Sequence, residues 1–349
     1  MPLLAGNVRD PELSAFDIED AVSKLPMAQE SLLAQPDLYM NELLLQAAFQ
    51  QDTLGTPKIV EREQGVTEGH LRQFMSEEFV PERLVMVGVN VDHNEFCQMA
   101  ASNFADMPKG NPSEDRVGKA TPKYVGGEIR VEDTSEMAGD LCHLAIGFHT
   151  AGWNSDDLAP VTVLQMLLGG ASSFSTGGPG KGMHSRLYTN VLNQCRFMES
   201  ALCFNTLYSD AGIFGLYMTG EPQSGPSMAQ VALREFSMLG KFTDEEVCRA
   251  KNALKSSVFM NLESRSLVMD DIGRQLLMSG KLATAAQFVA MIDTVTSEDL
   301  VRVAKTILAS PPTVVAFGHG VDKVPKYEEL KKHFAIVHNM LTGARQTKI

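Results

Sequence analysis

The sequence lacks a run of the ~20 uninterrupted apolar residues that a membrane-spanning helix needs. Its longest apolar stretches, such as Leu84–Val89 and Thr313–Phe317, have the length of single β-strands. It also has only five cysteines, scattered and without any C-x-x-C pair. A zinc knuckle and a redox motif are therefore not indicated, and a reducing compartment fits best. We expect the protein to reach a membrane only through partners.

Positive charge is also scarce. The 349 residues hold 30 Lys and Arg against 43 Asp and Glu, which gives a net charge of −13. An acidic surface repels phosphate, so nucleic acid is not an expected partner, whereas a basic ligand such as an Arg-rich peptide is. Simple solubility is the alternative explanation. The first ten residues carry one Arg and match neither a secretory signal nor an amphipathic presequence, so they give no import address.

Catalytic motifs are missing as well. None of the eight histidines lies in H-E-x-x-H or its inverted form, and there is no G-x-S-x-G elbow. His143 and His149 share one face of a predicted strand but have no nearby carboxylate, so a structural role is favoured over metal binding. The paired acids Asp156-Asp157, Glu245-Glu246 and Asp270-Asp271 are typical of solvated helix faces. The sequence offers no self-contained catalytic site.

Two segments of the chain match each other. Residues 66–92 and 295–322 each run from Val-Thr through a predicted helix to a proline, then through a Val-rich run to Val-Asp. Each opening Thr can cap a helix, and each Val-rich run predicts a buried strand. A chance match is possible, since one helix-Pro-strand unit is common, but the agreement at both ends favours duplication.

The offset between the two segments, 229–230 residues, predicts two homologous units. The first, residues 1–107, is N-terminally incomplete by about a hundred residues on this offset, residues 108–122 have the composition of a linker, and residues 123–349 form the second unit. Helices are predicted over Asp157–Leu168 and from Thr243 to Asn261, with a strand over Ala211–Thr219. Strands and helices do not alternate strictly, so the predicted class is α+β, with mixed sheets packed against helices.

The most unusual segment is residues 169–182, in which six of fourteen residues are glycine. Glycine allows left-handed backbone angles and close approach to a ligand. The segment fails both phosphate-binding patterns, because Gly180-Lys181 is followed by Gly182 rather than Ser or Thr and the glycine spacing is wrong for a dinucleotide fold. We therefore favour a functional loop of another kind over a surface loop without a role.

Beyond these patterns, the chain resembles the pitrilysin-like metallopeptidases, and among them the alpha-type subunits of mitochondrial processing peptidases, which share a family with the core subunits of the cytochrome bc1 complex. The resemblance spans residues 11–330. It is carried by the following segments: Leu167–Ser175, Gly177–Met183, Ser185–Asn193, Tyr208–Gly215, Arg249–Ser256, Met260–Arg265, Asp271–Leu277, Asn41–Leu44 and Asp52–Pro57.

The resemblance implies a non-catalytic, presequence-binding subunit in a zinc metalloendopeptidase heterodimer. Zinc is expected in a beta-type (core 1) partner and no cofactor in this chain, so whether to regard the chain itself as an enzyme stays open. The implied location is the mitochondrial matrix or the matrix side of the inner membrane, with cytochrome bc1 subunits as further candidate partners. The implied residues that bind the basic presequence are Gly169, Gly170, Ser173, Phe174, Ser175, Gly177, Gly178, Pro179, Gly180, Lys181 and Gly182.

The sequence departs from this family in two respects. The segment in which a metal-binding helix would lie is absent, and an incomplete first sheet would expose strand edges unless a partner covers them. Ala171 and Ser172 stand where glycines are more common, which stiffens the loop. Two alternatives stay open: a purely structural core subunit of the bc1 complex, and a nucleotide-binding module that uses the glycine segment.

Overall fold

The computed structural model describes residues 1–58, 65–109, 121–133, 140–172 and 183–343. Contacts within the chain divide it into two compact units. The sheet unit comprises residues 32–58, 121–260 and 283–349, and the helical unit comprises residues 1–31, 59–120 and 261–282. These segments differ from the limits 1–107 and 123–349 expected from the repeat, because residues 32–58 group with the sheet and residues 261–282 with the helices. The proposed duplication itself stays a prediction.

The sheet unit is built on one six-stranded mixed sheet, which places the described part of the chain in the predicted α+β class. The order across the sheet is β1-β6-β2-β5-β4-β3, with β1 and β6 parallel and the other neighbours antiparallel. The strands are β1 Gly127–Glu132, β2 Cys142–Ala151, β3 Gly170–Ser172, β4 Met198–Leu207, β5 Ala211–Gly220 and β6 Thr313–Gly318. The central strands β5 and β6 are buried along their whole length, as their apolar runs predict.

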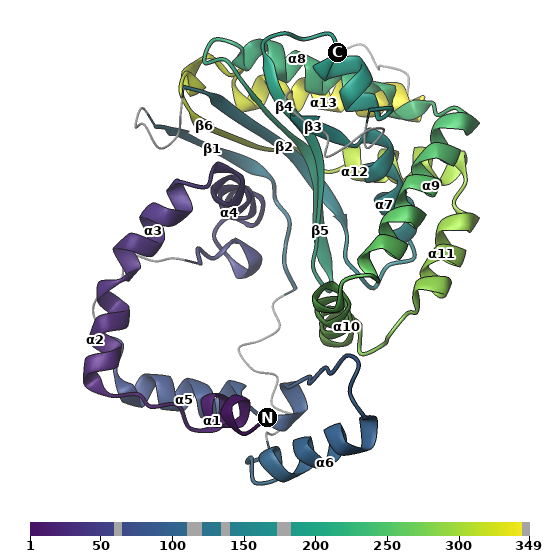
Figure 1. Ribbon diagram of the computed structural model, residues 1–349. Coiled ribbons are helices and arrows are strands. Elements are labelled where there is room, and N and C mark those ends of the chain that lie inside the picture. The colour runs from purple at the N-terminus through teal and green to yellow at the C-terminus, as the bar shows by residue number, and fades with distance from the viewer. Residues whose placement is uncertain (59–64, 110–120, 134–139, 173–182, 344–349) are drawn as a thin grey trace. The chain divides into compact units, whose positions relative to one another are not determined.

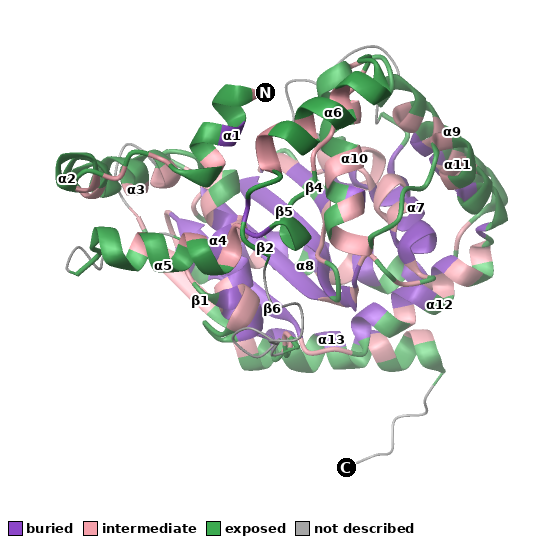
Figure 2. Ribbon diagram, turned by 90° about the horizontal axis from the view of Figure 1, so that it is seen from below, coloured by how far each residue is buried: buried purple, intermediate pink, exposed green. Residues whose placement is uncertain are grey.

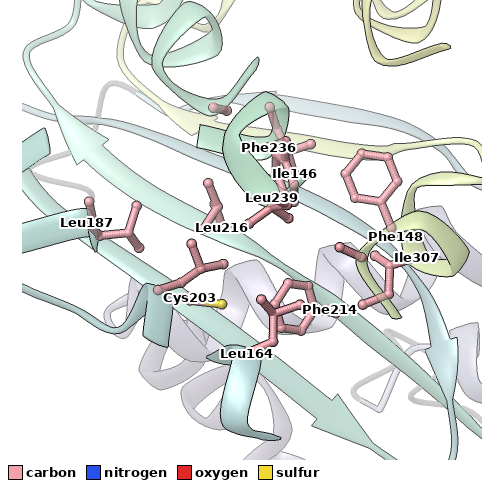
Figure 3. Packing of buried hydrophobic residues seen from close by; sticks show 14 of the residues in the cluster. Ile146, Phe148, Leu164, Leu187, Cys203, Phe214, Leu216, Phe236, Leu239 and Ile307 are labelled. Carbon is pink, nitrogen blue, oxygen red and sulfur yellow. The ribbon is translucent and has the colours of Figure 1, made fainter. Parts of the chain in front are cut away.

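Helices cover one face of this sheet and enclose the larger core (Figures 1 and 3). A triangle of edge-to-face rings, Phe148, Phe236 and Phe334, joins β2 to two helices, with ring centroids 5.1–5.6 Å apart. The central strands of the sheet are buried, whereas the covering helices also carry many exposed residues (Figure 2). The helices of the sheet unit after the first strand are α7 Leu158–Leu168, α8 Gly225–Ser237, α9 Asp244–Asn261, α11 Ala285–Thr294, α12 Ser297–Leu308 and α13 Tyr327–Thr342.

A single earlier helix, α4 (Pro36–Phe49), packs on the opposite face of the sheet. Eight of its fourteen residues are buried, and Leu44 and Phe49 lie in a core with Val315 and Phe317 of β6. Tyr39 meets Phe317 edge to face at 5.1 Å. Residues far apart in sequence thus form the second core layer.

The predicted helix starts and ends are confirmed at several places. Thr243 and Glu246 form a capping box at the start of α9, and Thr296 and Asp299 form another at α12. Helix α7 ends before Gly169, as its sequence predicts, and begins at Leu158, one residue later than predicted, after Asp157, whose side chain does not cap it.

The helical unit has little core of its own. Its helices are α1 Pro2–Arg9, α2 Ala15–Ser23, most of α3 Leu25–Leu33, α5 Glu68–Glu78, α6 His93–Phe104 and α10 Arg265–Ser279. Helices α2, α3, α5 and α6 contain no buried residue. The helix predicted after Thr67 is present as α5, with Thr67 in a capping box.

The strand predicted at Leu84–Val89 is not formed, and that expectation was wrong. Leu84 has extended backbone angles, φ −99° and ψ 133°, but a strand needs a hydrogen-bonded neighbour. All six strands in the described part of the chain belong to the one sheet, and none pairs with this segment. The Val-rich composition favours an extended backbone, but it does not supply the neighbouring strand that a β-strand needs.

Two further features agree with the composition. All five cysteines are free, and Cys142 and Cys203 are buried. Among the described residues, no helix is both long enough and apolar enough to cross a bilayer.

Candidate functional site

The glycine-rich segment starts where α7 meets the edge of the sheet. Gly169 and Gly170 have φ values of +60° and +129°. A Cβ on Gly169 would lie 2.4 Å from Cβ of Ser185, and one on Gly170 would lie 2.2 Å from the carbonyl oxygen of Ala201. Both backbone angles and space therefore require glycine at these two positions.

The next residues are held as a short edge strand. Residues 170–172 form β3, antiparallel to Ser200–Leu202 of β4. The carbonyl of Gly169 accepts a hydrogen bond from the backbone N–H of Cys203 at 2.8 Å. The chain entering the segment is thus fixed to the sheet.

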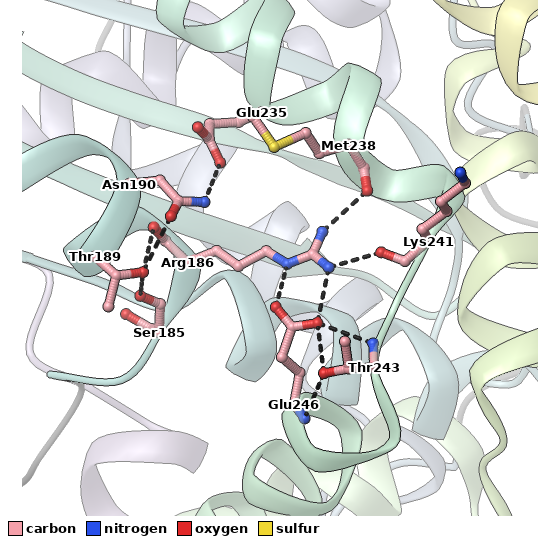
Figure 4. A network of polar contacts seen from close by, with 9 residues as sticks. All are labelled: Ser185, Arg186, Thr189, Asn190, Glu235, Met238, Lys241, Thr243 and Glu246. Carbon is pink, nitrogen blue, oxygen red and sulfur yellow. Dashed lines mark hydrogen bonds and ion pairs between the residues drawn. The ribbon is translucent and has the colours of Figure 1, made fainter.

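Arg186 anchors the chain where it leaves the segment (Figure 4). Its Nε and Nη2 donate to the two carboxylate oxygens of Glu246 at 2.8 and 3.0 Å. Its guanidinium also donates to the carbonyls of Met238 at 3.0 Å and Lys241 at 2.7 Å. The ring of Phe242 lies 4.8 Å below it, so this cation is bidentately paired and stacked. The geometry is one that Lys cannot reproduce.

Glu246 connects this anchor to α9. Its carboxylate also accepts hydrogen bonds from the backbone N–H of Thr243 at 2.9 Å and from the Thr243 hydroxyl at 3.1 Å. The Arg186 guanidinium, helped by Thr243, lowers the pKa of Glu246 from 4.5 to about 2. The carboxylate is therefore charged at any physiological pH, and the anchor persists.

A second polar cluster lies beside the anchor. Glu235 of α8 is 1% exposed and accepts from Arg234 at 3.1 Å, while Arg234 donates to the carbonyl of Asn190 at 2.8 Å. Ser185 and Leu187 are buried on either side of Arg186. The residues after the glycine segment are thus tied to both α8 and α9.

The two described ends of the segment meet. The contact between Gly169 and Ser185 places the exit of the chain next to its entry. These described ends, residues 169–172 and 183–186, form a fixed base at the edge of the sheet. Of the eleven residues expected to bind a presequence, Gly169 and Gly170 lie in this base. The other nine, Ser173, Phe174, Ser175, Gly177, Gly178, Pro179, Gly180, Lys181 and Gly182, lie outside the described residues.

Sequence reasoning missed the Arg186–Glu246 pair. The capping box identified Glu246, but the 60 residues between the two partners hide their pairing. The sequence shows only that Arg186 lies four residues after Gly182. No local pattern identifies which acid completes it.

His143 and His149 pack against aromatic side chains. His143 is buried, and its Nδ1 lies 2.7 Å from the hydroxyl of Tyr217. Burial lowers the pKa of His149, whose ring lies 5.3 Å from that of Tyr124. Over the described ranges of the chain, no group of three or more His, Cys, Asp or Glu side chains could hold a metal ion.

The paired acids serve ion pairs at the surface. Asp157 pairs with Arg302 at 2.8 Å, and Glu245 pairs with Arg249 at 2.7 Å. Asp270 pairs with Arg274, one turn further along α10. Glu245 and Asp270 agree with the solvated helix faces that the sequence predicted, whereas Glu246 does not, because it is only 22% exposed and is paired with Arg186.

Comparison with known proteins gives consistent matches. The family model described as "Peptidase M16 inactive domain" matches residues 65–254. A probable mitochondrial-processing peptidase subunit alpha-1 from Arabidopsis thaliana is 33% identical over 342 residues, covering 95% of this chain and 65% of that protein. The human mitochondrial-processing peptidase subunit alpha is 31% identical over 94% of this chain and 65% of its own length.

Two further comparisons extend the result. The probable Schizosaccharomyces pombe alpha subunit is 31% identical, covering 96% of this chain and 70% of that protein. A chain of the structure titled "Complex III2 from Candida albicans, Inz-5 bound" superposes with a TM-score of 0.80 at 18% identity, covering 95% of this chain and 78% of that one. That likeness shows the shared fold. The chain spans about 65% of the length of the first curated relatives it matches.

Proposed function

Because the chain belongs to the M16 peptidase family, among the alpha subunits of mitochondrial processing peptidases, we propose that it is a non-catalytic, presequence-binding subunit. The named relatives are mitochondrial, which supports a mitochondrial location for this chain. We place it on the matrix side, where imported precursors emerge. A beta-type subunit that holds the zinc would be its partner and would supply the bond cleavage.

The observation that carries the proposal is the fixed base of the glycine-rich segment. Gly169 and Gly170 admit no side chain, and Arg186 holds the other end through a fully ionised carboxylate. A glycine-rich sequence lacks the side chains that would obstruct contact between its backbone N–H and C=O groups and a peptide. It can therefore contact many precursors that share only their basic, amphipathic character.

Charge supports the same ligand. The chain carries 13 more acidic than basic residues, so it attracts cationic peptides over a range of about a Debye length. Association with an Arg-rich presequence should consequently weaken as ionic strength rises. Within this assignment the subunit selects and positions the precursor, and the partner's metal carries the chemistry.

The test is a reconstitution with a zinc-bearing beta partner. The isolated chain should cleave no presequence, and the pair should. Deleting Gly177–Gly182 should lower kcat/KM by about tenfold or more through an increase in KM, because the lost contacts act in binding. Deleting the six residues 344–349 provides a control of equal length and should leave the kinetics unchanged. Unchanged kinetics after the first deletion would remove the glycine segment from the function.

A second role is supported by the likeness to a complex III chain, which shows a shared fold. The two roles are compatible, since one subunit can serve in an assembly and bind precursors. Co-purification with cytochromes b and c1 in mild detergent would establish the structural role. A chain that joins the complex but does not support cleavage with any beta partner would be a purely structural subunit. A null titration with ATP or NAD would exclude the nucleotide-binding alternative.

A further inference from the structure

A cavity beside the Arg186 anchor has no part in the function proposed above. Its volume is about 650 Å³, within the range of roughly 300–1,000 Å³ that is usual for small-ligand sites. Its walls come from the π-helical turn Tyr188–Leu192, the end of α8, the connection from α8 to α9, and the last turns of α13. All these elements belong to the sheet unit, so the cavity lies within one compact body.

One side of the cavity is apolar and adaptable. Met238 and Met340 line it and are 38% and 69% exposed. Leu341 lies against the backbone of Gly240, where an added Cβ would be 2.6 Å from Leu341 Cδ2. Unbranched thioether side chains adjust their shape to a flexible apolar group and gain by being covered. This side therefore suits the aliphatic part of a ligand.

The hydrogen-bond acceptors on the polar side of the cavity are already in use (Figure 4). Both carboxylate oxygens of Glu246 accept from Arg186, at 2.8 and 3.0 Å. The carbonyls of Met238 and Lys241 accept from the same guanidinium. The backbone and amide oxygens of Asn190 accept from neighbouring side chains at 2.8 and 3.3 Å. A ligand that mainly donates hydrogen bonds is therefore not the one that this wall fits.

The donors on the same side retain capacity. Among the described residues, the ammonium of Lys241 makes no hydrogen bond or ion pair. Nδ2 of Asn190 lies 3.5 Å from the carboxylate of Glu235, beyond the distance of a good hydrogen bond. Because Glu246 balances the charge of Arg186, Lys241 leaves the lining with one positive charge in excess. Free donors and a net positive charge are complementary to an anion.

We propose that this cavity binds an aliphatic carboxylate of the fatty-acid class, with its head at Lys241 and Asn190 and its chain against Met238, Met340 and Leu341. A single free lysine suits a singly charged head, whereas phosphate is usually met by bidentate arginine or several cations. Burial of the chain against the methionines provides most of the affinity, and the lysine selects the sign of the head group. The site is independent of the presequence-binding role proposed above.

Methyl NMR of the full chain, labelled at the methionine methyl groups, tests this directly. The probe is sodium decanoate, and replacement of each methionine by leucine assigns its signal. The signals of Met238 and Met340 should shift saturably, with a Kd of about 0.1–1 mM for a ligand of this size. Decyltrimethylammonium, which has the same chain and a cationic head, should bind at least several-fold more weakly. Acetate, which lacks the chain, should give no shift.

Variants of the protein provide the second arm. Lys241→Gln removes the free charge but keeps the backbone carbonyl that binds Arg186, and it should raise the Kd for decanoate by about three- to fivefold. Lys332→Gln, at an exposed lysine of α13 outside the lining, is the matched control and should leave the Kd unchanged. Met340→Glu places a carboxylate at an exposed position of the apolar side, and it should abolish the shift of Met238.

Three outcomes would overturn the proposal. The first is the absence of a saturable shift at Met238 and Met340. The second is equal binding of decanoate and decyltrimethylammonium, or an unchanged Kd in Lys241→Gln, since either would show that no anion is recognised. The third is a Kd that tightens when Gly177–Gly182 or residues 344–349 are deleted, which would mean that the chain's own residues occupy the cavity.

Discussion

At the scale of single residues, the pair Arg186–Glu246 fixes the chain that follows the glycine-rich segment. They join two elements 60 residues apart, and each also binds backbone atoms. Because both side chains are largely buried, with 11% and 22% exposed, removing one leaves the other as an uncompensated charge.

We predict that Arg186→Gln lowers the free energy of unfolding by about 1–3 kcal/mol, because it breaks a charged, bidentate hydrogen-bonded pair. Urea denaturation followed by the fluorescence of Trp153, the single tryptophan, measures this. Arg249→Gln is the control, since its pair with Glu245 is exposed and should contribute less than about 0.5 kcal/mol. Equal losses in the two variants would contradict the importance of the Arg186 anchor.

The pH dependence of stability provides a separate test of Glu246. Its folded pKa lies below its ordinary value, so its ionised form stabilises the fold fully above about pH 4.5. That contribution declines as pH falls towards 2, where the folded-state carboxylate takes up a proton. The difference in unfolding free energy between the wild type and Glu246→Gln should therefore be constant from pH 7 to pH 5 and shrink below that. A difference independent of pH down to pH 2.5 would be inconsistent with the pair.

Gly169→Ala should lower the free energy of unfolding by about 2–3 kcal/mol, because φ is +60° and a methyl group would overlap Ser185. Gly280→Ala is the matched control. Gly280 has a similar φ of +66° but no atom within 4 Å of its added Cβ, so only the backbone preference, about 1 kcal/mol, should be lost. Thermal unfolding of both variants measures the two losses of unfolding free energy, and their difference is the cost of the clash with Ser185. Equal losses would contradict tight packing around Gly169.

At the scale of secondary-structure elements, α4 shows how a segment can belong to a sheet that begins about eighty residues later. Its sequence has little helical amphipathicity, because one side of the helix packs on β6 and others are covered by neighbouring chain. Pattern reading therefore offered no reason to assign it to the second unit. Contact with Phe317 and Val315 decides that assignment.

Two leucine-to-alanine substitutions in α4, one at a buried and one at an exposed position, test this packing. Leu44→Ala removes a side chain that is 2% exposed and should cost about 2–4 kcal/mol, from lost burial and the cavity left behind. Leu38→Ala, at 55% exposure, should change stability by less than about 0.5 kcal/mol. Trp153 fluorescence in urea reports both. If Leu44→Ala were as mild as Leu38→Ala, α4 would not be part of the sheet's core.

Some secondary-structure elements could be predicted from the sequence, and others could not. Caps and breakers placed α5, α9, α12 and the end of α7, since these signals act through residues a few positions apart. Apolar runs placed β5 and β6 for the same reason. Leu84–Val89 carries an equally good run yet forms no strand, because pairing is non-local and is set by which neighbours are present. The Arg186–Glu246 pair was missed on the same ground.

At the scale of the whole molecule, the chain combines a sheet unit with an extensive core and a helical unit with very little. Four described helices of the helical unit, α2, α3, α5 and α6, contain no buried residue. The chain belongs among the alpha subunits, and the role proposed for it is to bind substrate for a catalytic partner.

The proposed division of labour predicts the metal content. Purified chain, dialysed after exposure to zinc and measured by atomic emission, should hold well below one zinc per chain, because the chemistry is assigned to the partner. Its complex with a beta-type subunit should hold one. One tightly bound zinc in the isolated chain would place the metal here and reverse the assignment.

The affinity of the reconstituted complex for a fluorescent, Arg-rich presequence peptide, compared between the intact chain and the Gly177–Gly182 deletion, tests the central claim most directly. The account predicts a Kd raised by about tenfold or more on deletion, which corresponds to about 1.4 kcal/mol, and a weaker affinity for both proteins at higher salt. An unchanged Kd in a complex that still assembles would contradict it.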